Sequence, residues 1–206
     1  MNHGRLPWLA LADLDPAQQA LHDSITASSR ASKPRPAPIA SPEGRLEGPF
    51  NALLFCPELG GSVQELGGSV RYGTSFTPRE REIAILVVSR AEDSDYERFI
   101  HTYSGREAGL TEDELAALES GAEPSTLSES EHAVWTIARA LATRRDLSDA
   151  EYVLARETLG HAKSVELVIL VGYYQLLALQ LRVWRVPVPT ETKYRTQVAP
   201  GQQAQS

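Results

Sequence analysis

The chain has 206 residues, and its single cysteine, Cys56, excludes an intrachain disulfide, a paired-cysteine redox motif and a cysteine-built zinc site. Lys and Arg number 20 against 27 Asp and Glu, and the formal net charge of −7 disfavours nucleic acid and anionic lipid as partners. The apolar share of 42% with 23% charged residues is typical of a globular domain.

The first residues contain no apolar run after a basic start, so we predict no secretory signal and a cytoplasmic protein. The most apolar stretch, 167–179, is shorter than the roughly 20 residues that a bilayer span needs. Glu166, Gln175 and Gln180 lie in or beside it. We therefore predict no membrane partner, and a helix that is buried in a core or in a subunit interface.

The first predicted helix begins at Asp15-Pro16, where an aspartate cap precedes a proline at the first helical position. Residues 28–49 follow as a long irregular connection with five prolines, and connections of this length are often lids or mobile segments. The next predicted helix contains glycine pairs at 60–61 and 67–68. These pairs predict close packing of another backbone, and the apolar face of this helix carries Leu59, Val63, Leu66 and Val70.

Capping boxes, in which Ser or Thr is followed three residues later by Glu, mark the starts of four later helices: Thr77/Glu80, Thr111/Glu114, Ser128/Glu131 and Ser148/Glu151. Glycines stand where C-terminal caps belong, at Gly109, Gly121 and Gly160. Together these signals predict helices at 78–91, 95–108, 112–120, 129–144, 149–159 and 164–184. Because alternating strand patterns are absent, we predict an all-α fold of about seven or eight helices, with 164–184 central.

Three polar residues are candidates for chemistry. Six apolar residues follow Glu82, so its helix should be largely buried, and a buried carboxylate either pairs or has its pKa raised. Glu97 and His101 are four residues apart, so their side chains share a helix face and can exchange a proton near neutral pH. By spacing alone, an exposed Glu97–His101 pair and a salt bridge from Glu82 are the more common interpretations.

The sequence contains no pattern that predicts a metal or a cofactor. None of the five histidines has a second histidine at metal-ligand spacing. A glycine-rich phosphate loop, a His-Glu-x-x-His pair and a Gly-x-Ser-x-Gly elbow are also absent. We therefore predict a cofactor-free protein without a metal.

Several stretches of the chain together carry a family resemblance: 48–54, 81–87, the Tyr-Glu-x-x-x-His run at 96–101 with 108–110, and 170–174 leading to 186–189. In this order they resemble the carboxymuconolactone decarboxylase family, which includes the alkyl hydroperoxidase D peroxidases. The resemblance implies a helical domain at 48–189, preceded by an N-terminal helix and Pro-rich connection at 1–47 and followed by a flexible tail at 190–206. It also implies a homo-oligomer, a trimer or a hexamer.

Peroxidases of this family are similar to a Glu-x11-Cys-x2-Cys-x3-His motif, in which Glu82 and His101 match the outer residues. The two cysteine positions hold Ser94 and Glu97. A serine hydroxyl cannot reduce a peroxide, because the reaction needs a thiolate that is oxidised and then resolved. Cys56 lies outside the motif and is predicted to be buried and structural.

The surviving acid–base half of the motif resembles the non-redox decarboxylase branch of the family. That branch implies a small-molecule substrate, carboxylated or enolisable, and a decarboxylation, isomerisation or cyclisation. His101 would be the proton donor, Glu97 its orienter and Glu82 a second acid or base.

A carboxylated substrate also needs a cation, for which Arg71 and Arg182 are the candidates, and Tyr96 is a further candidate for substrate binding. Two alternatives stay open. One is an alkyl hydroperoxidase-like peroxidase, which the missing thiols disfavour. The other is a non-catalytic oligomeric relative that binds a ligand.

Overall fold

The computed structural model describes residues 1–28 and 36–189, and their regular structure is almost entirely helical. They form eight helices of six residues or more and the single-turn α2, which confirms the all-α prediction. The helices are α1 (Pro16–Thr26), α2 (Phe50–Leu53), α3 (Pro57–Tyr72), α4 (Pro78–Ala91), α5 (Asp95–Glu107), α6 (Glu112–Ser120), α7 (Glu129–Arg144), α8 (Asp149–Leu154) and α9 (Gly160–Trp184). Residues 29–35 of the predicted connection and the predicted tail at 190–206 lie outside the described residues.

Short non-α segments complete the regular structure. A hairpin of β1 (Asn2–His3) and β2 (Leu6–Pro7) opens the chain, and two-residue strands are too short to leave an alternating pattern in the sequence. The 3₁₀ turn η1 (Leu11–Asp13) follows. A π-helical turn, η2 (Ala155–Leu159), continues α8, so the helix predicted at 149–159 has two parts.

All four predicted capping boxes are formed. In each one the Ser or Thr side chain accepts the backbone N–H three residues on, and the glutamate at that position accepts the N–H of the capping residue. Gly109 and Gly121 have the positive φ angles that helix ends need, +90° and +83°. One predicted boundary is wrong: α9 begins at Gly160 instead of 164, and Ser164 Oγ donates to the Gly160 carbonyl, 2.7 Å away.

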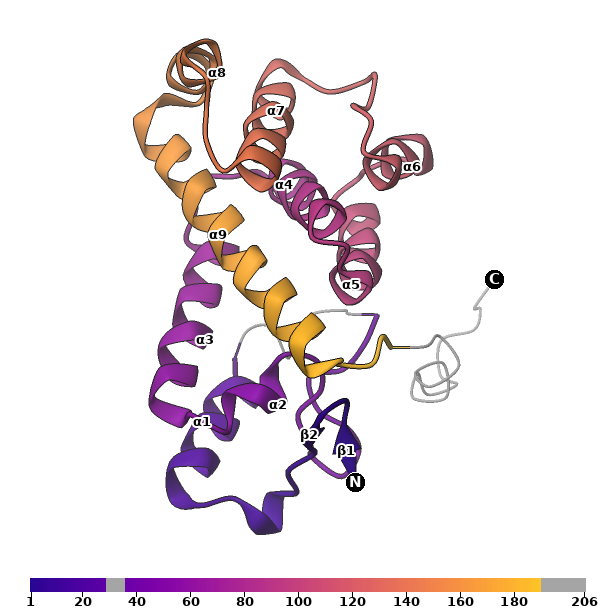
Figure 1. Cartoon of the computed structure of the whole chain (residues 1–206), viewed down its shortest axis with the longest axis vertical. Helices are drawn as coiled ribbons and strands as arrows, with labels where there is room; N and C mark the ends of the chain where they lie inside the picture. The colour runs from indigo at the N-terminus through magenta and orange to yellow at the C-terminus, as the bar shows by residue number, and fades with distance from the viewer. Residues whose placement is uncertain (29–35, 190–206) are drawn as a thin grey trace, which may run out of the picture.

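The core is built around α4, which packs against α5, α6, α7 and α9. Every side chain from Glu82 to Ser89 is buried. α9 runs from beside α8 towards the hairpin, with α3 beside it, while α1 and α2 lie at one end of the molecule and α6, α7 and α8 towards the other (Figure 1). The prediction that this last long helix is central holds only in part, because α9 packs against α3, α4 and α7 but α4 forms the centre of the core.

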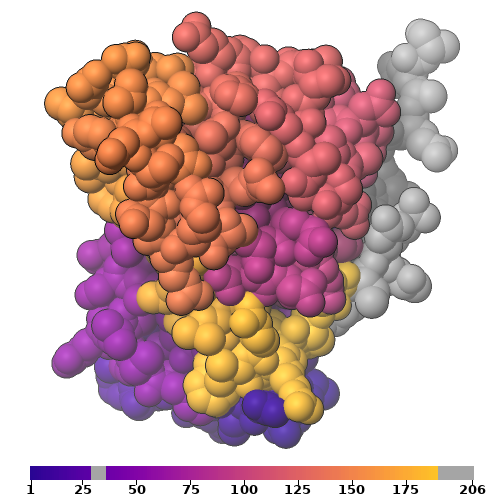
Figure 2. All heavy atoms as spheres, turned by 45° about the horizontal axis from the view of Figure 1, so that its top comes forward, coloured from indigo at the N-terminus to yellow at the C-terminus, as the bar shows by residue number. Residues whose placement is uncertain are grey.

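A smaller apolar cluster joins α1, α2 and the start of α3. A Cβ atom at Gly60 would lie 2.6 Å from the Leu53 carbonyl oxygen, so the predicted close backbone approach is present there. Gly61 and Gly68 face open space, and the prediction is wrong for them. The end of α9 meets the first residues of the chain (Figure 2), where the Arg5 N–H donates to the Trp184 carbonyl at 2.7 Å.

Only one face of α9 is buried. Leu167, Leu170 and Leu177 lie in the core, whereas Val168 and Leu179 on the other face are 50% and 56% exposed. The helical run 149–184 is long and apolar enough to cross a membrane by length and composition, a test that core helices of soluble proteins also pass. In the single chain, 44% of its most apolar window is buried.

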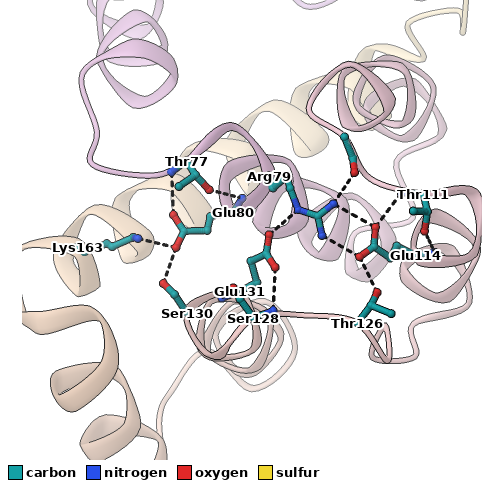
Figure 3. A network of polar contacts seen from close by, with 11 residues as sticks. Thr77, Arg79, Glu80, Thr111, Glu114, Thr126, Ser128, Ser130, Glu131 and Lys163 are labelled. Carbon is teal, nitrogen blue, oxygen red and sulfur yellow. Dashed lines mark hydrogen bonds and ion pairs between the residues drawn. The ribbon is translucent and has the colours of Figure 1, made fainter.

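The N-termini of α4, α6 and α7 are tied together by a network of charged side chains (Figure 3). The Arg79 guanidinium binds both Glu114, at 2.8 and 3.2 Å, and Glu131, at 2.6 Å. Glu80 accepts from Ser130 on α7 and from Lys163 on α9, the latter at 2.6 Å. The glutamates of three capping boxes therefore also connect four helices.

Candidate functional site

A cavity of about 280 Å³ opens between α3, α4, α5 and α9 and the segment that precedes α2. Its polar lining consists mainly of charged residues and tyrosines: Arg71, Arg81, Glu82, Glu97, His101, Glu107, Tyr72, Tyr96, Tyr103, Tyr173 and Tyr174, with Ser104. Phe50, Ile100 and Leu177 are among its apolar residues, and Pro36 and Pro49 bring the described end of the long connection to its wall. Of the sequence-predicted site residues, all except Arg182 lie in this lining.

The imidazole of His101 is held between two carboxylates. Its Nδ1 lies 2.6 Å from Glu82 Oε2, and its Nε2 lies 3.2 Å from Glu97 Oε2. An ionised carboxylate only accepts, so Nδ1 carries a proton towards Glu82. The contact between Glu97 and His101 predicted from their spacing is present, but the shorter contact that orients the ring comes from Glu82 on another helix.

Glu82 also forms ion pairs with two arginines. Its Oε1 lies 3.2 Å from Arg71 Nη2 and 3.8 Å from Arg81 Nε. The Glu82 side chain is only 2% exposed, so these cations and His101 compensate the cost of burying its charge. Arg71 also hydrogen-bonds the Tyr174 hydroxyl, and the Tyr174 ring packs edge-on against the His101 imidazole with centroids 5.2 Å apart.

The surroundings shift the pKa values of the central pair in opposite directions. Burial alone raises the pKa of Glu82, but the charge and hydrogen bond of His101 and the charges of Arg71 and Arg81 outweigh it, so this pKa lies below its ordinary value. Burial alone lowers the pKa of His101, but Glu82 and then Glu97 outweigh it and raise the pKa above its ordinary value. The pair therefore rests as carboxylate and imidazolium.

Burial also raises the pKa of Tyr174, beyond the opposing effect of Arg71, so its phenol stays protonated. The site thus contains a charged group that can donate a proton, the His101 imidazolium, and a neutral hydroxyl on Tyr174. The rings of the two residues are in edge contact. Within residues 1–28 and 36–189, no group of three or more His, Cys, Asp or Glu side chains is arranged to hold a metal ion.

Tyr96 is buried at the edge of the cavity, next to the loop that precedes α2. Gly48 in this loop has φ +61°, and a Cβ atom there would lie 2.2 Å from the Tyr96 hydroxyl oxygen. Only glycine therefore lets the loop approach Tyr96 this closely. The 48–54 stretch acts on the site by closing the cavity wall.

Two sequence-based predictions do not fit the structure. Arg182 lies outside the cavity lining, because its guanidinium is bound to Glu92, with Nη2 3.0 Å from Oε2. Cys56 is exposed instead of buried, because it precedes the first turn of α3 at the surface. Neither Cys56 nor Ser94 lines the cavity that contains His101.

Sequence reasoning missed Arg81 and Tyr174. Arg81 directly precedes Glu82 in the sequence, which was a signal that could have identified it. Only the fold, however, brings Arg81 to the same carboxylate oxygen as Arg71. The Arg81 Nε atom is buried and has no hydrogen-bond partner among the described residues. Tyr174 belongs to an apolar helix, where an aromatic residue signals packing as readily as function.

Comparison with known proteins gives a family match over part of the chain and a fold. Residues 57–140 match the model of the carboxymuconolactone decarboxylase family, and this segment contains Arg71, Arg81, Glu82, Glu97 and His101. A search among curated proteins found no significant match.

Several solved structures share the fold. A peroxidase-related protein from Ralstonia eutropha with an alkylhydroperoxidase core superimposes with a TM-score of 0.70 at 13% identity, over 94% of this chain and 96% of that one. The debrominase Bmp8, a variant of which was solved with 2,3,4-tribromopyrrole, gives 0.68 at 10% identity, over 91% and 94%. A protein of unknown function from Agrobacterium tumefaciens gives 0.62 at 17% identity, over 70% and 99%.

These identities are too low to transfer an activity, and they establish the fold alone. The family match covers the helices that supply the cavity's charged residues, and the fold agrees over nearly the whole chain. The segment 57–140 therefore matches the carboxymuconolactone decarboxylase family, and the chain has an alkyl hydroperoxidase D-like fold.

Proposed function

We propose that this protein is a cofactor-free acid–base enzyme that acts on a small carboxylated or enolisable molecule by decarboxylation, isomerisation or cyclisation. The observation that carries the proposal is the His101 imidazolium, buried between Glu82 and Glu97 at the wall of a cavity. The two carboxylates fix the orientation of the ring and favour its protonated form, which suits a proton donor.

The proposed step begins with a carbanion or enolate that forms in the cavity. In a decarboxylation, the C–C bond to the carboxylate breaks and CO2 leaves. The electron pair of that bond stays on the substrate and forms the enolate. His101 Nε2 then gives its proton to carbon, while Glu82 keeps the proton on Nδ1. Solvent restores the Nε2 proton, and Glu97, 3.2 Å away, can relay it.

Two neighbouring guanidiniums of the lining support an anionic substrate. Arg71 and Arg81 both contact Glu82 Oε1, so they lie on the same side of the cavity, while Glu97 and Glu107 also belong to the lining. The substrate carboxylate would bind beside Arg71 and Arg81, and the enolate charge would develop near the same cations. Tyr96, which lines the same cavity from α5, remains a proposed contact to the substrate.

Proton exchange with solvent tests the proposal without knowledge of the natural substrate. Small β-keto and lactone carboxylates are incubated with the enzyme in D2O and followed by NMR. We expect deuterium to enter substrate or product at carbon with at least one of these compounds. His101→Asn should slow this exchange by about 10²–10⁴-fold.

His161→Asn is the matched control, because His161 is exposed on the first turn of α9. Exchange that is equally fast in His101→Asn and wild type would disprove the proposed donor. Saturable binding of these carboxylates without any exchange would instead support the non-catalytic ligand-binding alternative. Hydroperoxide turnover that disappears in Cys56→Ser would support the peroxidase alternative.

We also propose that the protein is soluble and cytoplasmic and forms a homo-oligomer, a trimer or a hexamer, through the exposed face of α9. Six apolar residues on this face are 39–59% exposed, with Gly172 between the two groups of three: Val165, Val168, Ile169, Leu176, Leu179 and Val183. An exposed apolar face of this kind is unusual on a monomer and typical of an interface. Figure 2 shows the second half of α9, in yellow, uncovered at the surface.

Sedimentation velocity tests the assembly. We expect a mass well above 22.6 kDa for the wild type, and a shift towards the monomer in Val168→Lys/Leu179→Lys. Leu59→Lys is the control, because Leu59 is 64% exposed on α3. A wild type that sediments as a monomer at micromolar concentration would contradict the proposal.

A further inference from the structure

A second cavity, of about 220 Å³, lies between α4, α6 and α7 and shares no lining residue with the first. Val87, Leu118 and Trp135 form its apolar part, and Arg90 and Arg139 enter from α4 and α7. None of its lining residues is acidic, although the chain carries a net charge of −7. The second cavity is therefore a local cationic and apolar site on an acidic protein.

Both arginines lack a carboxylate partner. Within the described ranges 1–28 and 36–189, neither Arg90 nor Arg139 forms an ion pair, whereas Arg79, Arg106 and Arg144 each bind a glutamate. Their positive charges are therefore available to a ligand. Arg90 alone would indicate little, because a cation in the last turn of a helix is favoured by the helix dipole.

Arg139 is different, because an aromatic ring holds it in position. Its guanidinium carbon lies 5.3 Å from the centroid of the Trp135 ring, within the range of a cation–π contact. Trp135 is buried, with only 8% of its surface exposed, so the ring forms part of the core as well as of the cavity wall. The ring therefore presents an apolar surface and a fixed cation side by side.

We propose that the second cavity binds a small amphipathic anion, a monocyclic aromatic or short alkyl carboxylate. Its apolar part would lie against Trp135 and Leu118, and its carboxylate would lie between Arg90 and Arg139. The volume is below the roughly 300–1,000 Å³ of sites for drug-sized ligands, so one ring fits better than two. This binding is independent of the proposed function, since the two cavities are separate.

The test uses benzoate as the probe, followed by two-dimensional ¹H–¹⁵N NMR of the indole N–H signals. Trp135→Phe identifies the Trp135 signal, and Trp8 and Trp184 serve as internal references. We expect a saturable shift of the Trp135 signal at millimolar benzoate. Benzamide, which has the ring without the charge, and acetate, which has the charge without the ring, should each bind at least about tenfold more weakly.

Arg90→Gln/Arg139→Gln should weaken benzoate binding about tenfold or more, whereas Arg145→Gln, at the end of α7 and outside this cavity, should not. Arg71→Gln should leave the Trp135 shift unchanged, which separates this cavity from the first one. Equal affinities for benzoate and benzamide, an unaltered shift in the double variant, or no saturable Trp135 shift would each overturn the proposal.

Discussion

Two clusters of charge begin on the same turn of α4 and differ in how completely their groups are paired. Arg79 and Glu80 join the network that ties α6, α7 and α9 to α4 (Figure 3). Arg81 and Glu82, the next two residues, instead face His101 and the cavity. The sequence Arg-Glu-Arg-Glu therefore supplies one structural and one candidate functional cluster from neighbouring positions.

In the network, every carboxylate is bound by several donors. Glu114 accepts from Arg79 twice, from Thr126 at 2.7 Å and from the Thr111 backbone at 2.8 Å. Burial of Glu80 is likewise offset by Lys163, Ser130 and the Thr77 backbone, so its pKa lies below the ordinary value. None of these carboxylates lines the cavity that contains His101, and a network satisfied in this way stabilises one packing arrangement.

Around His101, one buried donor atom, Arg81 Nε, has no hydrogen bond among the described residues, and its residue lies beside the cavity of about 280 Å³. An unsatisfied buried donor costs stability unless a ligand binds it. The comparison teaches that completeness of pairing, and not charge density, distinguishes the two clusters.

The largest expected effect separates Glu82 from Glu80, two residues apart on one helix. Glu82→Gln removes the anion that holds the imidazolium, so turnover at neutral pH should fall by about 10²-fold or more. Glu80→Gln should keep wild-type turnover, because Glu80 contacts no residue of the cavity. Steady-state kcat of the two purified variants measures this difference. An equal loss of kcat in both variants would contradict separate roles for Glu82 and Glu80.

The next effect concerns stability. Arg79→Met leaves Glu114 and Glu131 without their shared cation, so the free energy of unfolding should fall by about 1.5–3 kcal/mol while kcat is unchanged. Urea unfolding measures this loss. Arg156→Met is the control, because the exposed Arg156–Glu157 pair should contribute at most about 1 kcal/mol. Equal losses in the two variants would show that the network is no more stabilising than a surface pair.

The network also predicts how stability depends on acid. Hydrogen bonds from Arg79 hold the pKa of Glu114 at about 2, against 4.5 for an ordinary glutamate. A depressed folded-state pKa stabilises the fold above pH 4.5, and this contribution is lost as the pH falls towards 2. The free energy of unfolding should therefore decrease less steeply over this window in Glu114→Gln. Parallel curves for variant and wild type would contradict the assignment.

The smallest expected effect is a shift in the pH–rate profile. Because His101 is the proposed proton donor in its imidazolium form and its pKa is raised, activity should persist above pH 6.5 and decline as the pH rises through that raised pKa. Glu97→Gln removes one of the two anions that favour imidazolium, so the alkaline limb should move to lower pH. NMR titration of His101 provides an independent measurement, and Glu119→Gln, exposed on α6, is the control. A limb that moves to higher pH would refute this role of Glu97.

Helix boundaries were predictable because they depend on neighbouring residues. The four capping boxes were readable from pairs such as Thr77 and Glu80, since the cap and its acceptor are three residues apart. The Glu97–His101 contact was readable for the same reason, as both residues belong to one helix. The start of α9 was less predictable, because Gly160 both ends the π-helical turn and opens the next helix.

The composition of the site depended on contacts between distant segments. Arg71 on α3, Glu82 on α4, His101 on α5 and Tyr174 on α9 meet only after four helices have packed. The sequence by itself therefore determined the helices, the family resemblance and the Glu97–His101 pair, which all depend on local spacing or motif order. Only the tertiary structure decided that Glu82 makes the shorter contact with His101, that Arg81 joins the cavity and that Arg182 binds Glu92 instead, because each depends on long-range packing.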